Sequence, residues 1–261
     1  MSIHPTAIIA EGAQIAPDAE IGPYTIIGPK VRIGSGTWVG PHCVIEGRTT
    51  IGKNNRIFQF AALGAIPQDL KYAGEDTELV IGDDNQIREF TTMHLGTSGG
   101  GGITRVANGS LFMAYSHVAH DVSVGDRCII ANCAAIAGHV ILENDVHIGG
   151  LAGLHQFTRV GCHAFVAAGA VVTQDVPPYC IVQGDRATLA GLNAVGLARG
   201  GFSQEQIARI KSAYKTIFRT PELGLTEAIA RVRAEHGGHD EVDHMLVFLE
   251  GSTRGSVRRT H

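Results

Sequence analysis

The sequence predicts a mainly β protein: a parallel β-helix made of hexapeptide repeats, followed by a small α-helical C-terminal domain. Three observations predict this fold. An aliphatic residue recurs at every sixth position from Ile3 to Leu63 without a miss. The position two residues before it is usually small or β-branched, as at Ala7 and Thr25. Beyond Gly191 the six-residue period ends, and apolar residues take a helical spacing instead.

The six-residue repeat follows from the geometry of a triangular coil. Three hexapeptides form one coil of 18 residues, with the aliphatic side chain pointing inward and the small residue fitting beside a corner. Glycine or asparagine permits the backbone conformation that a corner needs. Short parallel strands join consecutive coils, which therefore rise by roughly 4.8 Å.

Two insertions interrupt the repeat. Residues 64–80 separate Leu63 from Ile81, where the repeat resumes in phase. A glycine-rich segment around residues 97–102 shifts the phase by one residue before Val106, and the repeat then continues to Val172. Long polar insertions in a regular solenoid are usually functional or disordered. Because both precede a cluster of histidines, we expect them to serve a functional site.

The end of the prism is predicted near residues 175–179, where Pro177 and Pro178 remove hydrogen-bond donors from the strands. Residues 203–206 resemble a helix capping box, and Pro221 ends the helix that follows. Further helices are predicted at residues 226–234 and 240–249. We therefore divide the chain into a β-helix, residues 1–190, and an α-helical domain, residues 191–261.

Composition narrows the class of protein. A net charge of −4 gives no reason to propose a nucleic acid partner, and no basic helix is typical of a membrane anchor. No long apolar run predicts a transmembrane helix, so we expect no stable membrane insertion. The N-terminus lacks the pattern of a secretory signal. Five cysteines, without a Cys-x-x-Cys pair, indicate reduced thiols and a cytoplasmic protein.

Four histidines are predicted to converge on one edge of the prism. Because a coil has 18 residues, Val118, which His117 and His120 flank, lies one coil below Ile136 and two coils below Leu154. His139 and His155 follow these two residues in the next coils. The cluster of His117, His120, His139 and His155 should lie within about 10 Å, two strand spacings.

Three interpretations of this cluster compete. A single imidazole at a corner can simply cap a turn. Several imidazoles on one wall can bind a catalytic zinc ion, as in the gamma-class carbonic anhydrases, which are also hexapeptide prisms. One histidine, His120 beside Asp121, can also act as an acid–base catalyst, since the histidine side chain can accept a hydroxyl proton near neutral pH. A non-catalytic scaffold or a sugar-nucleotide-binding module is a further alternative.

Several motifs in a fixed order resemble the UDP-N-acetylglucosamine O-acyltransferases, which catalyse the first step of lipid A synthesis. The resemblance covers nearly the whole chain, including the helical tail. The matching segments are residues 68–74, 117–121, 137–139, 155–157, 174–179 and 252–255.

The resemblance implies a left-handed β-helix and an acyl transfer without metal or cofactor. A 3-hydroxyacyl group would pass from acyl carrier protein to the glucosamine 3-hydroxyl of UDP-N-acetylglucosamine. His120 would be the general base, and Asp121 would hold its imidazole in the productive tautomer. The backbone N–H of Gly138 would donate a hydrogen bond to the developing oxyanion.

The same resemblance implies substrate-binding residues and a homotrimer with sites between subunits. Asp69 and His139 would contact sugar hydroxyls, and Lys71 would contact a phosphate. The sugar and acyl site would be lined by His117, His155 and Gln156. The nucleotide would be contacted by Asn193 and Arg199, and the end of the hydrocarbon groove by Ala168. The small residues at 167–169 should leave room for a longer acyl chain.

The chain departs from the family pattern at three positions. Gly200 stands where the family often has a second consecutive arginine, which predicts a missing phosphate contact. Val195 replaces an acidic residue, and Leu95 stands where arginine is common. These differences concern nucleotide affinity and carrier-protein docking, and leave the proposed catalytic residues unchanged.

Overall fold

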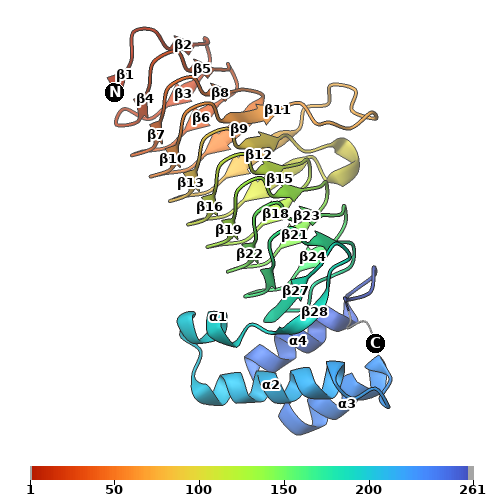
Figure 1. The fold of residues 1–261 in the computed structure, drawn as a ribbon. Coiled ribbons are helices and arrows are strands. Elements are labelled where there is room, and N and C mark those ends of the chain that lie inside the picture. Colours follow the sequence, from red (N-terminus) through yellow and green to blue (C-terminus); the bar gives the residue numbers. More distant parts are fainter. Residues whose placement is uncertain (1, 258–261) are drawn as a thin grey trace.

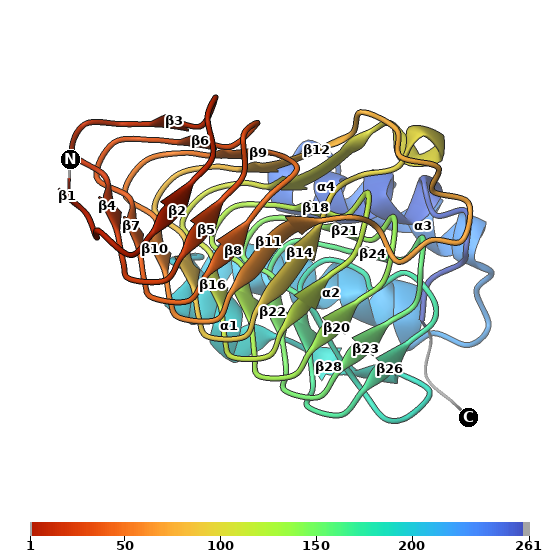
Figure 2. The same cartoon turned by 90° about the horizontal axis from the view of Figure 1, so that it is seen from above.

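The computed structural model describes residues 2–257 and shows an elongated prism with helices packed at its C-terminal end (Figure 1). The view from above shows three flat sides wound around a common interior (Figure 2). Each side is a sheet of short strands, to which successive coils contribute one strand each. The predicted parallel β-helix is therefore present.

Within residues 2–257 the strands form three sheets, here called A, B and C, with eleven, nine and eight strands. Sheet A contains β1 (Ser2–Ile3), β4 (Glu20–Ile21), β7 (Trp38–Val39), β10 (Arg56–Ile57), β13 (Gln86–Ile87), β16 (Leu111–Phe112), β19 (Ile129–Ile130), β22 (His147–Ile148), β25 (Phe165–Val166), β27 (Cys180–Gln183) and β28 (Thr188–Leu192). Sheet B contains β2 (Ile8–Ile9), β5 (Ile26–Ile27), β8 (Val44–Ile45), β11 (Ala62–Ala65), β14 (Thr92–His94), β17 (His117–Val118), β20 (Ala135–Ile136), β23 (Gly153–Leu154) and β26 (Val171–Val172). Sheet C contains β3 (Gln14–Ile15), β6 (Arg32–Ile33), β9 (Arg48–Ile51), β12 (Glu78–Ile81), β15 (Ile103–Val106), β18 (Ser123–Val124), β21 (Ile141–Leu142) and β24 (Arg159–Val160).

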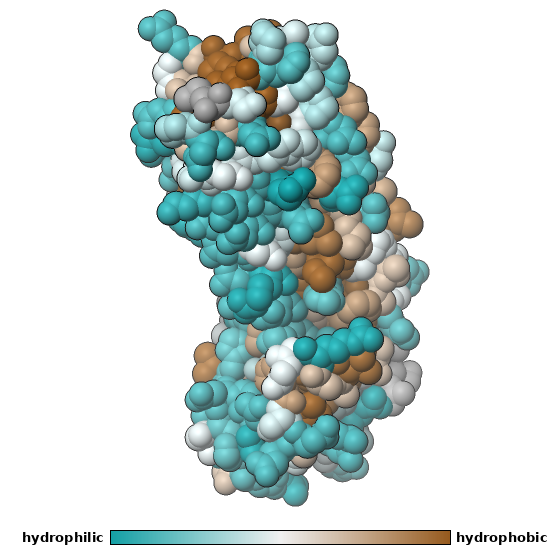
Figure 3. Space-filling model, turned by 90° about the vertical axis from the view of Figure 1, so that its left-hand side faces the viewer, coloured by the Kyte–Doolittle hydropathy of each residue, from teal (hydrophilic) through white to brown (hydrophobic). Residues whose placement is uncertain are grey.

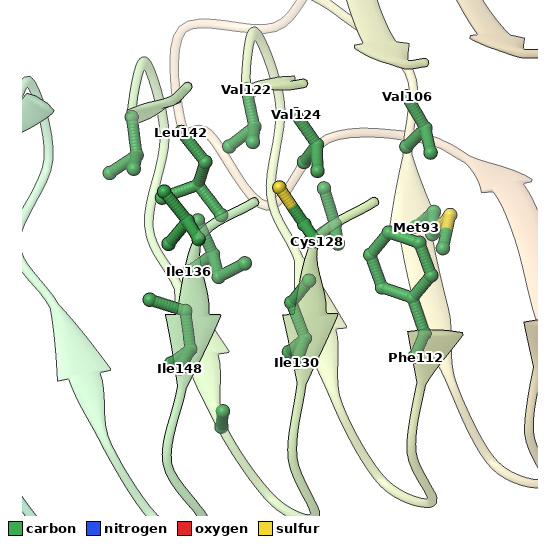
Figure 4. Packing of buried hydrophobic residues seen from close by; sticks show 14 of the residues in the cluster. Met93, Val106, Phe112, Val122, Val124, Cys128, Ile130, Ile136, Leu142 and Ile148 are labelled. Atoms are coloured by element: carbon green, nitrogen blue, oxygen red, sulfur yellow. The ribbon is translucent and has the colours of Figure 1, made fainter. Parts of the chain in front are cut away.

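The pairing register shows the 18-residue coil directly. Val118 pairs with Ile136, and Ile136 pairs with Leu154. These side chains are buried and stack along the interior of the prism. Figure 4 shows Ile130 and Ile148 stacked in the same way. The predicted inward-pointing aliphatic repeat is confirmed.

The chain turns at three corners, named AB, BC and CA after the sheets that they join. At these corners non-glycine residues take positive φ angles, as at Phe90 (59°, AB), Asp121 (59°, BC) and Asp145 (59°, CA). Such angles are uncommon for residues other than glycine. The expectation that glycine or asparagine supplies the corners is therefore only partly right, because the stacked coils impose this conformation on bulky residues too.

A ladder of aromatic rings runs along the AB corner. Five rings stack one above another, with centroids between 4.6 and 5.2 Å apart. Stacking of this kind stabilises each ring through its neighbours. The aromatic ladder consists of Tyr24, His42, Phe60, Phe90 and Tyr115.

Both predicted insertions leave the prism at the BC corner. The first, residues 66–77, connects β11 to β12, and the second, residues 95–102, connects β14 to β15 and contains the 3-10 helix η1 (Ser98–Gly100). The two loops lie side by side (Figures 1 and 2), and Ser98 Oγ donates a 2.9 Å hydrogen bond to Glu75 Oε1. They therefore form one projection over a single corner.

The prism ends later than the two prolines predict. Pro177 and Pro178 lie at the CA corner, where the strands make no ladder hydrogen bonds, and the ring of Pro178 occupies the space that a side chain at Gly161 would need. Sheet A continues beyond them with β27, parallel to β25, and with β28, antiparallel to β27. The predicted end near residues 175–179 is therefore wrong for sheet A. Sheets B and C do stop earlier, at β26 and β24.

Four α-helices follow: α1 (Ala194–Arg199), α2 (Gln204–Phe218), α3 (Leu225–His236) and α4 (Asp240–Glu250). The capping box of α2 is confirmed, because Ser203 Oγ accepts from the Gln206 N–H and Gln206 Oε1 accepts from the Ser203 N–H. Helices α3 and α4 match the predicted segments, whereas α1 was not predicted as a helix. The division between residues 190 and 191 falls inside β28, and it stays a prediction.

The face in Figure 3 is mostly hydrophilic, with apolar side chains gathered in separate patches. In the part of the chain that the structure describes, no helix combines the length and the apolar character that a membrane span requires.

Candidate active site

His120 lies at the BC corner, directly after β17. Its Nδ1 is 2.8 Å from Asp121 Oδ2, and its side chain is only 14% exposed. A hydrogen bond at Nδ1 fixes the tautomer and leaves Nε2 free to exchange a proton with another molecule. The pairing of these two residues, predicted from their adjacency, is therefore present.

Asp121 is held from beneath by the second insertion. Its side chain is fully buried, and it accepts hydrogen bonds from the backbone N–H of Thr97 (2.8 Å) and from Thr97 Oγ1 (2.6 Å). The loop can come this close because Gly100 has no side chain, and a Cβ atom there would collide with the Asp121 carboxylate. These donors compensate a buried negative charge, which would otherwise be costly.

Gly138 lies against the imidazole of His120, one coil further along the prism. A Cβ atom at this position would come within 2.6 Å of His120 Cε1 and 2.7 Å of His120 Nε2. Within residues 2–257 the Gly138 N–H donates no hydrogen bond. The absence of a side chain thus lets the ring approach an unoccupied backbone donor.

His139 packs edge-to-face on His120, with ring centroids 5.1 Å apart, and its Nε2 is 3.8 Å from Asp121 Oδ2. Its other face stacks on Phe157 at 4.3 Å. Burial lowers the pKa of His139, and His120 acts in the same direction, while Asp121 and Asp69 oppose the change. His139 is therefore held largely neutral at pH 7.

His117 lies in β17 and its Nδ1 is 2.7 Å from Thr92 Oγ1. Burial, and then the nearby His120, lower the pKa of His117. A neutral imidazole here can donate or accept a hydrogen bond without adding a positive charge beside His120.

A cleft of about 490 Å³ opens over these residues on sheet B. His155 and Gln156 lie exposed at its rim, where His155 Nδ1 is 3.3 Å from Arg254 Nη2. Several apolar side chains complete a surface that suits a molecule with both polar and hydrocarbon parts. The lining residues are Gln68, His117, Ala119, His120, Ala135, Ile136, Ala137, Gly138, Gly153, Leu154, His155, Gln156 and Val171.

Asp69 and Lys71 lie on the first insertion. The Lys71 N–H donates a 2.9 Å hydrogen bond to Asp69 Oδ1, and Lys71 itself is exposed. Asp69 is near enough to His139 to influence its pKa. The first insertion therefore brings Asp69 to the same corner as the histidines.

Three expected substrate-binding residues lie elsewhere in the chain. Asn193 and Arg199 line a separate cleft of about 390 Å³. The Asn193 side chain is already engaged, because it accepts from the Gly196 N–H (3.1 Å) and donates to the His163 carbonyl oxygen (2.9 Å). Ala168 is exposed at the AB corner. A single copy of the chain does not bring these three residues to His120.

Comparison with known proteins decides the family. A relative from Myxococcus xanthus (strain DK1622), named acyl-(acyl-carrier-protein)-UDP-N-acetylglucosamine O-acyltransferase, is 61% identical over 256 residues, which cover 98% of this chain and 99% of the relative. The chain belongs to the UDP-N-acetylglucosamine O-acyltransferase family. A protein of the same name from Anaeromyxobacter sp. (strain K) is 60% identical over 258 residues, covering 99% of this chain and 100% of the relative.

Solved structures of UDP-N-acetylglucosamine O-acyltransferases share the fold. The crystal structure from Moraxella catarrhalis RH4 matches with a TM-score of 0.96 at 42% identity, covering 99% of this chain and 100% of that one. Family models described as "Udp N-acetylglucosamine O-acyltransferase; Domain 2" and "Bacterial transferase hexapeptide (six repeats)" match residues 175–257 and 103–138. The expected left-handed parallel β-helix with a small helical C-terminal domain is thereby confirmed, as is the O-acyltransferase family itself.

The zinc interpretation has some geometric support, even in an O-acyltransferase. His120, Asp121 and His139 offer ligand atoms within 4.8 Å of one another. Both carboxylate oxygens of Asp121, however, already accept hydrogen bonds from Thr97, and one also faces His120. The arrangement therefore suits an orienting carboxylate better than a metal ligand.

Two residues of the site were missed by the sequence analysis. His94 is buried, its ring lies 4.8 Å from that of His117, and burial together with His117 and His120 lowers the pKa of His94 to about 4. Extending the coil register backward across the insertion would have found it, because Met93 pairs with Val118. Thr97 lies in an irregular loop, so no repeat could indicate its role.

Proposed function

We propose that this O-acyltransferase moves a 3-hydroxyacyl group from acyl carrier protein to the glucosamine 3-hydroxyl of UDP-N-acetylglucosamine, the first step of lipid A biosynthesis. One observation carries the proposal: His120, oriented by the buried Asp121, lies against the free N–H of Gly138 in an open cleft. The relatives from Myxococcus xanthus and Anaeromyxobacter are named for the same donor and acceptor, acyl carrier protein and UDP-N-acetylglucosamine.

The geometry supports a direct acyl transfer. His120 Nε2 takes the proton from the sugar 3-hydroxyl as its oxygen attacks the thioester carbonyl carbon. The imidazolium that forms is stabilised by Asp121, and the carbonyl oxygen, now negative, accepts a hydrogen bond from the Gly138 N–H. When the intermediate collapses, the carbon–sulfur bond breaks and His120 returns its proton to the thiolate of the carrier.

Substrate contacts follow from the chemistry of the surrounding residues. Asp69 and neutral His139 bind sugar hydroxyls, while Lys71 meets a phosphate as a point charge. His117, His155 and Gln156 bind the sugar and acyl parts in the cleft, where neutral His117 acts through a hydrogen bond. The apolar wall of sheet B accommodates the hydrocarbon.

The assembly in this proposal is a cytoplasmic homotrimer with sites between subunits. Asn193 and Arg199 bind the nucleotide, and Ala168 limits the hydrocarbon groove, only if another copy presents them to the His120 cleft. Their position away from that cleft in one chain supports such sharing.

A product assay tests the proposal. The protein is incubated with carrier proteins bearing 3-hydroxyacyl groups of several lengths and with either UDP-N-acetylglucosamine or its 3-amino analogue, and products are identified by mass. We expect an O-acylated sugar nucleotide, and a fall in kcat of about 10²–10⁴ in His120→Ala. His4→Ala, an exposed histidine at the far end, is the control. No acylated product from any pairing would refute the proposal.

A further inference from the structure

A second group of reactive side chains lies at the junction of the β-helix and the helical domain. Glu143 and Cys162 come from two successive coils at the CA corner, and His244 comes from helix α4. The three residues are up to 101 positions apart in sequence. Their ligand atoms nevertheless all lie within 4.8 Å of one another.

The geometry of this junction is well defined. His244 Nε2 is 2.7 Å from Glu143 Oε2, which also accepts a 2.9 Å hydrogen bond from the Cys162 N–H. Arg159 Nη2 approaches the other carboxylate oxygen at 4.0 Å. Contacts of this kind from outside a metal site orient its ligands. The Glu143 side chain is 23% exposed and that of His244 is 43% exposed, so one side is open to solvent.

The donor set is that of a zinc ion. A thiolate, an imidazole nitrogen and a carboxylate oxygen are the ligands that Zn²⁺ takes in proteins, whereas Mg²⁺ and Ca²⁺ require oxygen alone. In a tetrahedral site of these ligands the donor atoms lie roughly 3.3–3.7 Å apart. His244 Nε2 and Glu143 Oε2 are closer than this, at 2.7 Å, so binding of the ion requires the imidazole to move away from the carboxylate and to give up their hydrogen bond.

We propose that Glu143, Cys162 and His244 bind a Zn²⁺ ion that joins helix α4 to the β-helix, with water as the fourth ligand. Helix α4 packs in a hydrophobic core of its own, which includes Met245 and Leu249. The ion connects this core to the prism. It lies at a different corner from His120, so it stabilises the chain without taking part in acyl transfer.

Metal analysis of the full chain tests the proposal. The protein is stripped with a chelator, loaded with Zn²⁺, desalted and measured for bound zinc. We expect one equivalent per chain in the wild type and a loss of most of it in Cys162→Ala and in His244→Ala. Cys133→Ala is the matched control, since Cys133 is an exposed thiol at the AB corner. This variant should retain the zinc. Circular dichroism checks that each variant is folded.

Two further measurements distinguish this site from binding at the catalytic corner. Co²⁺ in place of Zn²⁺ should give a thiolate charge-transfer band that Cys162→Ala abolishes and Cys133→Ala keeps. Free Zn²⁺ at about a hundredfold excess over its Kd should raise the Tm by roughly 5–10 °C in the wild type and in Cys133→Ala, but not in Cys162→Ala. Either of two results would overturn the proposal. One is a zinc content that is unchanged in Cys162→Ala but lost in His139→Asn. The other is less than a tenth of an equivalent of zinc in the wild type.

Discussion

The AB and BC corners use the same backbone for different purposes. Both place non-glycine residues at positive φ, as at Phe90 (59°) and Tyr115 (62°) on one corner and at Asp121 (59°) and His139 (62°) on the other. At the AB corner the side chains stack into the aromatic ladder. At the BC corner the stack is reduced to His139 on Phe157, and Asp121 turns beneath the second insertion instead.

The difference teaches that the coil supplies positions and the insertions supply chemistry. A carboxylate at a bare corner would be solvated, as at any exposed turn. Thr97 and Gly100 cover Asp121, so its charge faces two imidazoles, His120 at 2.8 Å and His139 at 3.8 Å. The proposed catalytic residues thus lie where the regular repeat is interrupted.

Closing the gap between Gly138 and His120 should have the largest effect. In Gly138→Ala the new methyl group would occupy the space of the His120 ring, which must then leave its position over the backbone N–H. We expect kcat to fall by about a hundredfold or more, since a misplaced base and a lost oxyanion donor each carry such a penalty.

Gly191→Ala is the matched control for this substitution, because no atom lies within 4 Å of a Cβ added there. Steady-state kinetics compare the two variants. Equal activity in both would mean that the contact between Gly138 and His120 has no catalytic weight.

Acid should weaken the BC side more than the AB corner. The folded-state pKa of His94, about 4, lies below its ordinary value of 6.5, so protonation favours the unfolded chain. The contribution of His94 to stability is present above pH 6.5 and is lost as the pH falls through 4. At pH 5 the loss should be about 2 kcal/mol.

Urea unfolding between pH 7 and pH 4 measures this loss. His94→Gln should show a smaller decrease in the free energy of unfolding than the wild type. His42→Gln, in the aromatic ladder, should keep the wild-type decrease. Identical curves for the wild type and His94→Gln would contradict the assignment.

Removing one donor from Asp121 should have an intermediate effect on catalysis. Thr97→Val deletes the 2.6 Å hydroxyl hydrogen bond and leaves the backbone donor in place. A hydrogen bond to a charged group contributes roughly 1.5–3 kcal/mol, so we expect kcat to drop by about tenfold or somewhat more. KM should change little, because Thr97 positions Asp121 and does not line the cleft. Thr97→Ser keeps a hydroxyl and should therefore have the kcat of the wild type. If kcat falls as far in Thr97→Ser as in Thr97→Val, the hydroxyl hydrogen bond is not the cause of the loss.

Interrupting the aromatic ladder should have the smallest effect and leave catalysis alone. Phe90→Ala removes a ring that stacks on both Phe60 and Tyr115. Phe90 is 39% exposed, so we expect a loss of about 1 kcal/mol of stability, visible as a lower Tm with unchanged kcat. Tyr24→Ala, at the end of the ladder, should cost less. A larger drop for Tyr24→Ala would show that the stacking is not cooperative.

The sequence predicted the parts of the molecule that repeat. An aliphatic residue every six positions fixes the coil, and coil arithmetic alone brings His117, His120 and His139 to one edge. The insertions obey no period, so the hydrogen bonds of Thr97 could not be derived from the repeat. The place of His94 beside His117, by contrast, follows from the register once the coils are aligned across the second insertion. The position of Asn193 and Arg199 in another cleft could not be derived from the repeat either, because both residues follow its end.

The two ends of the prism are unequal. In the part of the chain that the structure describes, β1, β2 and β3 each pair with a strand on one side only, and Ile3 and Ile9 are only half-buried. At the other end the last coil is covered by β28 and the helices. In a solenoid whose coils contact only their neighbours, opening begins at the uncovered end and advances coil by coil. Amide hydrogen exchange should therefore be fastest in the first coil and slow progressively toward β17, so that the chain can fray at its beginning while His120 keeps its geometry.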